Sequence, residues 1–339
     1  MVLALILLVL FGLSFLFNIQ QFAASLVPGA GPRYMHSAGP RLEEVLLEDH
    51  DSPEKVAVIE IHGIISSQLA DPGGFGMVEV VKAEFKRAQQ DRRVRAVILD
   101  VNSPGGEVLA ADEISRIVAN FQEQTDKPVV AAMRDLAASG GYYVSAPCRW
   151  IVANELTLTG SIGVIMSTWN YRHLMDKVGI RPQVYKSGKF KDMLSGSRDP
   201  DNIPPEEKRM LEALIEQTYN KFKGVVEKGR SRPAAAEEGR PLREDWVEYA
   251  DGRILSGKDA YELGFVDELG SFEDAVKRAR KLAGIAQANV VKYQPRYDLG
   301  DLLRLFGKSE KTSLKLDLGF EPPKLQAGKL YFLPPSFLQ

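Results

Sequence analysis

The longest hydrophobic run of the chain lies at its N-terminus. The segment MVLALILLVLFGLSFLF is continuously apolar, and no charged residue precedes Arg33. Through Val27 the run is long enough to cross a bilayer, which takes about 20 residues. A cleaved signal peptide is the alternative, but it usually begins with basic residues, which are missing here, and FAAS is a weak cleavage site. The pattern predicts an uncleaved membrane anchor over residues 1–27.

Apolar strand-like runs alternate with amphipathic helical patterns along the middle of the chain. A stretch rich in Pro, Gly and charge over residues 28–54 predicts a linker before them. Strands separated by helices of about 10–15 residues indicate βαβ units and a mostly parallel sheet. The strand-like runs are KVAVIEIHGII, VRAVILDVN, KPVVAAM and WIVANE, and the helical ones include VEVVKAEFKRAQQD and LAADEISRIVANFQE.

The second half of the chain continues this pattern less regularly. TLTGSIGVIM reads as a loop leading into a strand, and RPQVYKSG is predicted to return to the sheet. Prolines and acidic residues open a long amphipathic helix from Pro204 to Lys228. After about Asn289 the periodicity weakens. We therefore expect one α/β domain over residues 55–288 and a C-terminal extension over 289–339.

Composition narrows the function classes. The net charge of −2 gives no electrostatic reason to expect a nucleic-acid partner. A single cysteine, Cys148, excludes a disulfide framework within the chain. The four histidines are scattered, and none has the spacing of a metal site.

Two Gly-rich turns follow two strands of the predicted sheet. They are Ser103-Pro-Gly-Gly106 and Ser139-Gly-Gly141. In open α/β sheets, sites form beyond the carboxyl ends of strands, so these turns are expected to stand side by side. The backbone N–H groups of Gly106 and Gly140 would then hold an acyl oxyanion, with Ser139 exposed at a strand-to-helix junction. The alternative is that both are turns and nothing more.

A serine nucleophile needs a base. His62 lies within a strand and is expected to pack in the core, and His173 is expected to be a surface or packing residue. Lysine is the other option, because burial disfavours the ammonium form and a neutral amine accepts a hydroxyl proton. Lys186, Lys189 and Lys191 lie together in YKSGKFKD. A solvated basic loop is the competing interpretation of this cluster.

Five motifs together resemble one known family. They are NSPGG, ASGGYY, TLTGSIGV, SGKFKD and YADGRILSGKDAYELGFVDELG, and the resemblance runs from about Lys55 to about Gly284. The chain resembles the membrane-anchored signal peptide peptidases of the SppA type. These are Ser/Lys proteases on a βαβ superhelical fold shared with Clp protease and the crotonases. The resemblance thus implies an α/β fold of the Clp protease/crotonase type, preceded by a transmembrane helix.

Site residues are carried over motif by motif. The resemblance implies Ser139 as the nucleophile and Lys191, the lysine directly before an aspartate, as the general base. Ser161 in TGSIGV would orient the lysine amine. Gly106 and Gly140 would form the oxyanion hole.

Partners and location follow from the same resemblance. It implies a homo-oligomeric ring, because the short members of the family complete their dyad where neighbouring domains meet. Peptides such as cleaved signal peptides would be the substrates. The protein would be a single-pass membrane protein with its catalytic domain on the extracytoplasmic side, and it would need no cofactor. The alternatives are an acyl-CoA hydratase or lyase of the crotonase fold, and a catalytically inactive ring-forming membrane scaffold.

Overall fold

The structure is a computed structural model. The predicted anchor over 1–27 lies almost wholly outside the residues that it describes, and so does most of the predicted extension over 289–339. Within the described ranges, no helix combines the length and the apolarity needed to span a bilayer. The described residues are 11–12, 14–15, 39–67, 75–236 (the last five by backbone only), 239–296 and 330–332.

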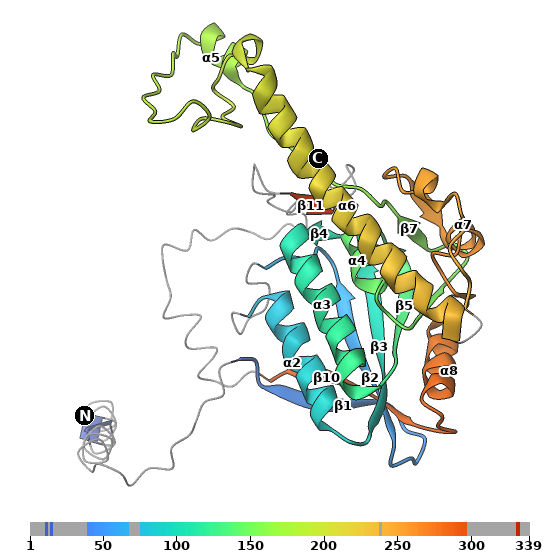
Figure 1. Ribbon diagram of the computed structural model, residues 1–339. Helices are drawn as coiled ribbons and strands as arrows, with labels where there is room; N and C mark the ends of the chain where they lie inside the picture. The colour runs from blue at the N-terminus through green and yellow to red at the C-terminus, as the bar shows by residue number, and fades with distance from the viewer. Residues whose placement is uncertain are drawn as a thin grey trace. The chain divides into compact units, whose positions relative to one another are not determined.

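A mostly parallel sheet forms the centre of the molecule (Figure 1). Its main path runs β1-β10-β2-β3-β5-β6-β9, and every neighbouring pair along it is parallel except β1 with β10. The sequence prediction of a mostly parallel α/β sheet is therefore confirmed. The strands are β1 (Leu42–Glu48), β10 (Asn289–Pro295), β2 (Lys55–His62), β3 (Val94–Ser103), β5 (Val129–Ala137), β6 (Trp150–Ala153) and β9 (Glu268–Leu269).

Four shorter strands gather near the carboxyl ends of β3 and β5. β7 (Leu158–Gly160) pairs with β5 and, antiparallel, with β8 (Ile254–Ser256). β4 (Gly106–Glu107) continues the chain after β3 and pairs antiparallel with β11 (Tyr331–Phe332). This edge of the sheet is therefore built from backbone supplied by distant parts of the chain.

Helices cover both faces of the sheet, and the strands alternate to match. Odd-numbered residues of β2, such as Ile59 and Ile61, belong to one buried cluster, whereas Val56 and Val58 belong to the other. The first face is covered by α2 (Met77–Gln90), α3 (Val108–Thr125) and α4 (Gly140–Ser145), and the second by α8 (Phe272–Leu282). Two shorter helices, η2 (Trp246–Tyr249) and α7 (Gly257–Glu262), lie in the connection that surrounds β8.

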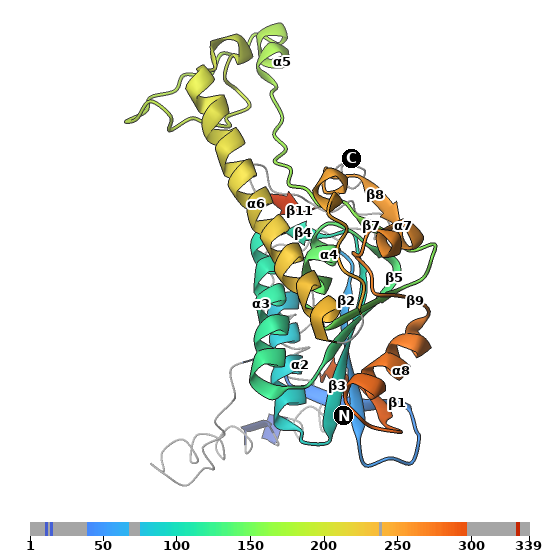
Figure 2. The same cartoon turned by 45° about the vertical axis from the view of Figure 1, so that its right-hand side comes forward.

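One long helix leaves the body and carries an arm at its far end. α6 (Pro205–Ala236) packs against the body by its C-terminal half, where Phe222 and Val226 are fully buried. Figures 1 and 2 show α5 (Arg172–Lys177) and the loops before α6, including the turn η1 (Pro200–Asn202), at the other end of this helix, away from the sheet. The prediction that residues 181–188 return to the sheet is therefore wrong. These residues form no strand, because no sheet edge lies beside them.

Two strands lie where the hydrophobic pattern indicated none. β1 falls within the stretch that was predicted as a linker, and β10 falls after Asn289, where periodicity weakens. β10 inserts between β1 and β2, parallel to β2. The sheet thus starts before residue 55 and ends after residue 288.

The buried carboxyl group of Glu84 is expected to make the free energy of unfolding depend on pH. Its side chain on α2 is buried against the sheet, and burial, reinforced by the charge of Glu60, raises its pKa from 4.5 to about 8. Between these values only the unfolded state releases the proton, so stability falls as pH rises and levels off above about 8. We expect Glu84→Gln to have a flatter profile of melting temperature from pH 5 to 9 and to exceed the wild type above pH 8. Parallel profiles would contradict this.

Candidate active site

Ser139 occupies a strained position between a strand and a helix. β5 ends at Ala137 and α4 begins at Gly140, and the serine between them has φ 52° and ψ −113°. Such a conformation costs a non-glycine residue about 1–3 kcal/mol and persists only when the surroundings enforce it. The Ser139 amide donates to the Gly160 carbonyl over 2.8 Å. The serine was predicted to be exposed, but it is 1% exposed, because neighbouring loops close around it.

The two Gly-rich turns lie side by side, as the sequence predicted. β3 and β5 are parallel neighbours, so their carboxyl ends meet at one edge. A Cβ placed on Gly140 would lie 3.0 Å from the Cα of Gly105 and 3.1 Å from the amide nitrogen of Gly106. Gly105 has φ 105°, and its amide donates to the Ser103 hydroxyl over 3.1 Å. A hydrogen bond within the turn after β3 therefore stabilises it, and its backbone packs against the start of α4.

Ser161 is brought to the same place by the backbone. It has φ 50° and is 5% exposed, and its amide donates to the Arg253 carbonyl over 2.7 Å. It directly follows Gly160, the residue whose carbonyl accepts from the Ser139 amide. Four of the five predicted site residues, Ser139, Ser161, Gly106 and Gly140, thus share one edge of the sheet.

Lys191 does not join them within this chain. It belongs to the arm at the far end of α6, where its side chain is exposed. The other two candidate lysines are engaged there: Lys186 Nζ lies 2.6 Å from Asp192 and Lys189 Nζ lies 2.5 Å from Glu206. Lys191 has no ion-pair partner among the described residues. Of the three candidate lysines, Lys191 is thus the one without an ion pair among the described residues, and the arm places it away from the edge of the sheet where Ser139 lies.

A segment from the end of the chain lies in the site, and sequence reasoning missed it. β11 pairs with β4 on one side, Phe332 opposite Gly106 and Tyr331 opposite Glu107. On its other side, Tyr331 exchanges backbone hydrogen bonds of 3.1 and 3.2 Å with Ile165. The only sequence signal was a short apolar, aromatic run, LYF, before two prolines. The structure thus has a strand-shaped slot beside Ser139, and its own C-terminal segment fills it.

An aromatic pocket receives one side chain of this segment. Phe332 is fully buried, with its ring centroid 4.8 Å from that of Tyr143 on α4 and 4.7 Å from that of Phe222 on α6. The Tyr143 hydroxyl donates to Asp112 on α3 over 2.8 Å, which fixes one wall. The slot can therefore hold an extended peptide through its backbone and one bulky ring through this pocket.

None of the three histidines within the described residues enters the site. His62 ends β2 as predicted, but its side chain is about half exposed, so the prediction of a packed core residue is wrong. Its Nε2 lies 3.3 Å from buried Asp100, the residue with which it forms an ion pair when protonated. The hydrogen bond to Asp100 raises the pKa of His62. Among the described residues no three His, Cys, Asp or Glu side chains are grouped in a way that holds a metal ion.

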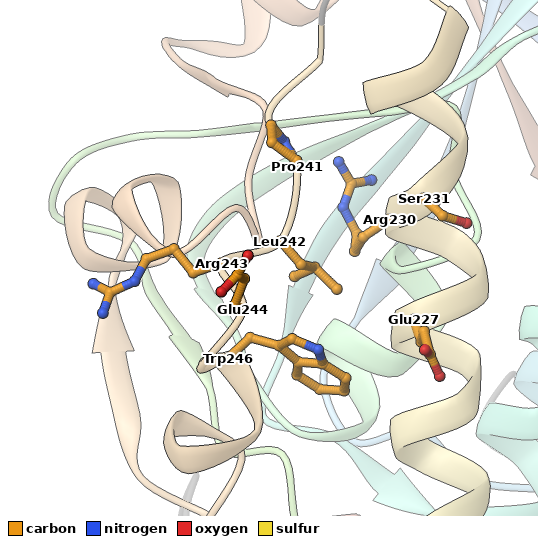
Figure 3. A pocket seen from close by; sticks show the side chains of 8 residues that line it. All are labelled: Glu227, Arg230, Ser231, Pro241, Leu242, Arg243, Glu244 and Trp246. Carbon is orange, nitrogen blue, oxygen red and sulfur yellow. The ribbon is translucent and has the colours of Figure 1, made fainter.

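A separate cavity lies between the end of α6 and the segment before η2 (Figure 3). Its volume is about 490 Å³, and its lining combines Arg230 and Arg243 with Glu227 and Glu244. Arg230 is fully buried and forms an ion pair with Asp267, whose pKa is raised by burial. This mixed lining includes none of the residues around Ser139 and favours neither anions nor cations.

Comparison with known proteins identifies the family of the chain. The model of peptidase family S49 matches residues 121–286. The "Putative signal peptide peptidase SppA" of Enterococcus faecium is 36% identical over 260 residues, which cover 75% of this chain and 71% of that protein. The chain belongs to peptidase family S49. It is a serine-type peptidase of the signal peptide peptidase SppA type.

Longer members of family S49 match over part of their length. "Serine protease SPPA, chloroplastic" of Arabidopsis thaliana is 32% identical over 263 residues, covering 76% of this chain and 38% of that protein. "Protease 4" of Haemophilus influenzae is 32% identical over 247 residues, covering 73% of this chain and 38% of that protein. The matched part of this chain thus corresponds to well under half of these two relatives.

Proposed function

We propose that this S49 peptidase is a membrane-bound endopeptidase that degrades cleaved signal peptides or other short hydrophobic peptides through a Ser139–Lys191 dyad. The observation that carries the proposal is the strained Ser139 at the end of β5, facing the Gly-rich turn after β3 and a slot for an extended peptide. A serine held in this way presents its hydroxyl at a defined point on a bound backbone.

The proposed reaction has two steps. Lys191, as the neutral amine, takes the proton of Ser139 while the serine oxygen attacks the scissile carbonyl. The amides of Gly106 and Gly140 stabilise the resulting oxyanion, and Ser161 orients the lysine amine. The acyl-enzyme is then hydrolysed by water activated by the same lysine. No metal or organic cofactor takes part.

The choice of Lys191 is supported by the charges on the arm. Asp192 forms an ion pair with Lys186 and Glu206 forms one with Lys189, so both of these amines already have a carboxylate partner. Arg198 links two parts of the arm. It contacts Asp192, and it forms an ion pair of 2.6 Å with buried Glu207 at the start of α6. Lys191 is the one amine of the three that these carboxylates leave free within the described residues.

The distance between the arm and Ser139 supports an oligomer. We propose that Lys191 of one chain reaches Ser139 of a neighbouring chain, so that a homo-oligomeric ring is required for activity. The arm carries exposed apolar side chains that suit a contact with another copy, such as Trp169, 80% exposed, and Tyr185, 92% exposed.

The remaining assignments complete the proposal. The peptidase domain over residues 55–288 would have the fold of Clp protease and the crotonases, with β1 and β10 completing its sheet from the two flanks. Residues 1–27 would anchor it in the cell membrane through the linker over 28–54, with the catalytic domain outside the cytoplasm. The aromatic pocket of Tyr143 and Phe222 supports a preference for hydrophobic peptides.

One experiment tests the reaction class. The detergent-solubilised full chain is treated with an acylating probe for active-site serines and, separately, with an enoyl thioester and a hydrophobic peptide. We expect the probe on Ser139, cleavage of the peptide and no turnover of the thioester. Thioester turnover without labelling would replace the proposal with a crotonase-type lyase. Assembled rings with neither activity would indicate an inactive scaffold.

A further inference from the structure

Lys191 lies in a part of the arm that forms neither helix nor strand, over residues 178–199. The backbone hydrogen bonds around it are local: its amide donates to the Gly188 carbonyl over 3.2 Å, and the Met193 amide donates to the Phe190 carbonyl over 3.0 Å. Exposed turns of this kind open at little cost in free energy, and a lysine side chain adds a flexible four-carbon stem. Contacts from outside the turns are therefore needed to fix the position of this amine.

The residue that follows Lys191 is held by two cations. Lys186 Nζ lies 2.6 Å from one carboxylate oxygen of Asp192, and Arg198 Nε lies 3.5 Å from the other. Lys186 Nζ also donates to the Lys189 carbonyl over 3.1 Å. The hydrogen bond from Lys186, together with the charge of Arg198, lowers the pKa of Asp192, so this group is a carboxylate at neutral pH. Asp192 thus has a cation on each of its two oxygens.

Arg198 joins this carboxylate to the start of α6. Its Nη1 lies 2.6 Å from the carboxylate of Glu207, which is 3% exposed. Glu207 belongs to the first turn of α6, where a carboxylate is favoured, and its amide donates to the Pro204 carbonyl over 3.0 Å. The same helix packs against the body by its other half. The chain of charges therefore begins on a rigid element and ends beside Lys191.

The backbone of Arg198 is fixed as well. The Asn170 side-chain amide donates to the Arg198 carbonyl over 3.0 Å, and the Tyr171 amide donates to the Gly196 carbonyl over 2.9 Å. A Cβ on Gly196 would collide with the Trp169 carbonyl oxygen, so the two chain segments lie in close contact. The guanidinium of Arg198 is thus held at both ends, by its own backbone and by its two carboxylate partners.

We propose that Glu207 and Arg198 are positioning residues for the general base, because they hold Asp192, and through it the backbone of Lys191, at a fixed place on α6. This inference rests on the proposed function. Neither side chain needs to touch the peptide or the reacting atoms. Asp192 is occupied by Lys186 and Arg198, so it does not pair with the amine of Lys191. If Lys186 is removed, Arg198 still holds Asp192.

The test replaces the buried ion pair by apolar side chains, in the double variant Arg198→Met with Glu207→Leu. No unpaired buried charge remains, so the arm should stay folded. For cleavage of a hydrophobic peptide by the detergent-solubilised full chain, we expect kcat to fall on the order of 10- to 100-fold, because the base is misplaced. KM should stay within about twofold, since the slot beside Ser139 is unchanged. Arg172→Met is the matched control: it breaks the ion pair with Asp176 in the same arm and should keep the wild-type kcat.

Mixed assemblies show in which chain the ion pair acts. Placed in Ser139→Ala chains, which supply Lys191, the double substitution should lower the activity of a mixture with Lys191→Ala chains. Placed in the Lys191→Ala chains, which supply Ser139, it should leave that activity unchanged. A general weakening of the fold or of the ring would lower both mixtures equally and would overturn the positioning role.

The homogeneous variants separate this inference from the proposed function. If the double variant keeps the wild-type kcat while Lys191→Ala is inactive, the positioning role is wrong and the proposed dyad stands. A raised KM with an unchanged kcat would also overturn the positioning role. If Lys191→Ala is itself active, both the dyad and the inference built on it are wrong. Thermal unfolding and the oligomeric state of each variant are measured alongside, and both should match the wild type.

Discussion

Replacing Ser139 with alanine is expected to lower kcat for peptide hydrolysis by on the order of 10⁴-fold or more, because the attacking oxygen is removed and members of a catalytic unit fail together. The fold should be unaffected, since alanine meets the same backbone strain at φ 52° as serine does. The measurement is peptide cleavage and probe labelling by the full chain, with thermal unfolding as the check of folding.

Ser139→Gly is the matched control. It also removes the hydroxyl group, but it should relieve the backbone strain at position 139, which Ser139→Ala does not. Glycine adopts positive φ without a steric penalty, so this variant should be as inactive as Ser139→Ala but more stable, by about 1 kcal/mol. An alanine variant that still gives an acyl-enzyme burst would remove Ser139 from the mechanism. Equal stability of the glycine and alanine variants would mean that the strain is not borne at this residue.

The body of the sheet and the core of the site follow from local sequence patterns. β2, β3 and β5 are apolar runs bounded by turns, and the alternation of helices makes them parallel neighbours. Because parallel strands end at one edge, the sequence also predicts that Gly106 and Gly140 meet, and the structure brings them together. The meeting of these two turns can be predicted from local sequence patterns, because it does not depend on which distant segments pair with the sheet.

Partners that are distant in sequence were not predictable. β10 has the composition of a strand, but nothing in its periodicity says that it inserts between β1 and β2. β11 is too short to give a period at all, and its pairing with Gly106 depends on a slot that exists only once the sheet is folded. Residues 181–188 show the reverse error, because strand-forming residues there find no edge to pair with.

The sequence also does not determine the position of the general base relative to the nucleophile. Motif resemblance names Lys191, but one chain's sequence does not say from which chain its amine approaches a given Ser139. The arm separates the two residues that the proposed mechanism joins. Only an experiment that distinguishes chains can test the pairing.

Lys191→Ala is accordingly expected to be as inactive as Ser139→Ala, since without the amine no group takes the serine proton. Lys186→Ala and Lys189→Ala are the matched controls, because each removes a lysine from the same arm that is already paired with a carboxylate. They should keep activity within about tenfold of wild type, as exposed ion pairs contribute little. If Lys189→Ala were inactive and Lys191→Ala active, the general base would be Lys189 and not Lys191.

Mixing the two inactive variants tests where the dyad forms. Chains with Lys191→Ala keep Ser139, and chains with Ser139→Ala keep Lys191, so a site between neighbours is complete when one of each meets in the right order. If equal amounts are dissociated and reassembled at random in a head-to-tail ring, roughly a quarter of the sites should be complete. Recovery of activity near that fraction would establish a dyad shared between chains. If the dyad instead formed within one chain, no mixture of the two variants would regain activity, because every chain would lack one of its two members.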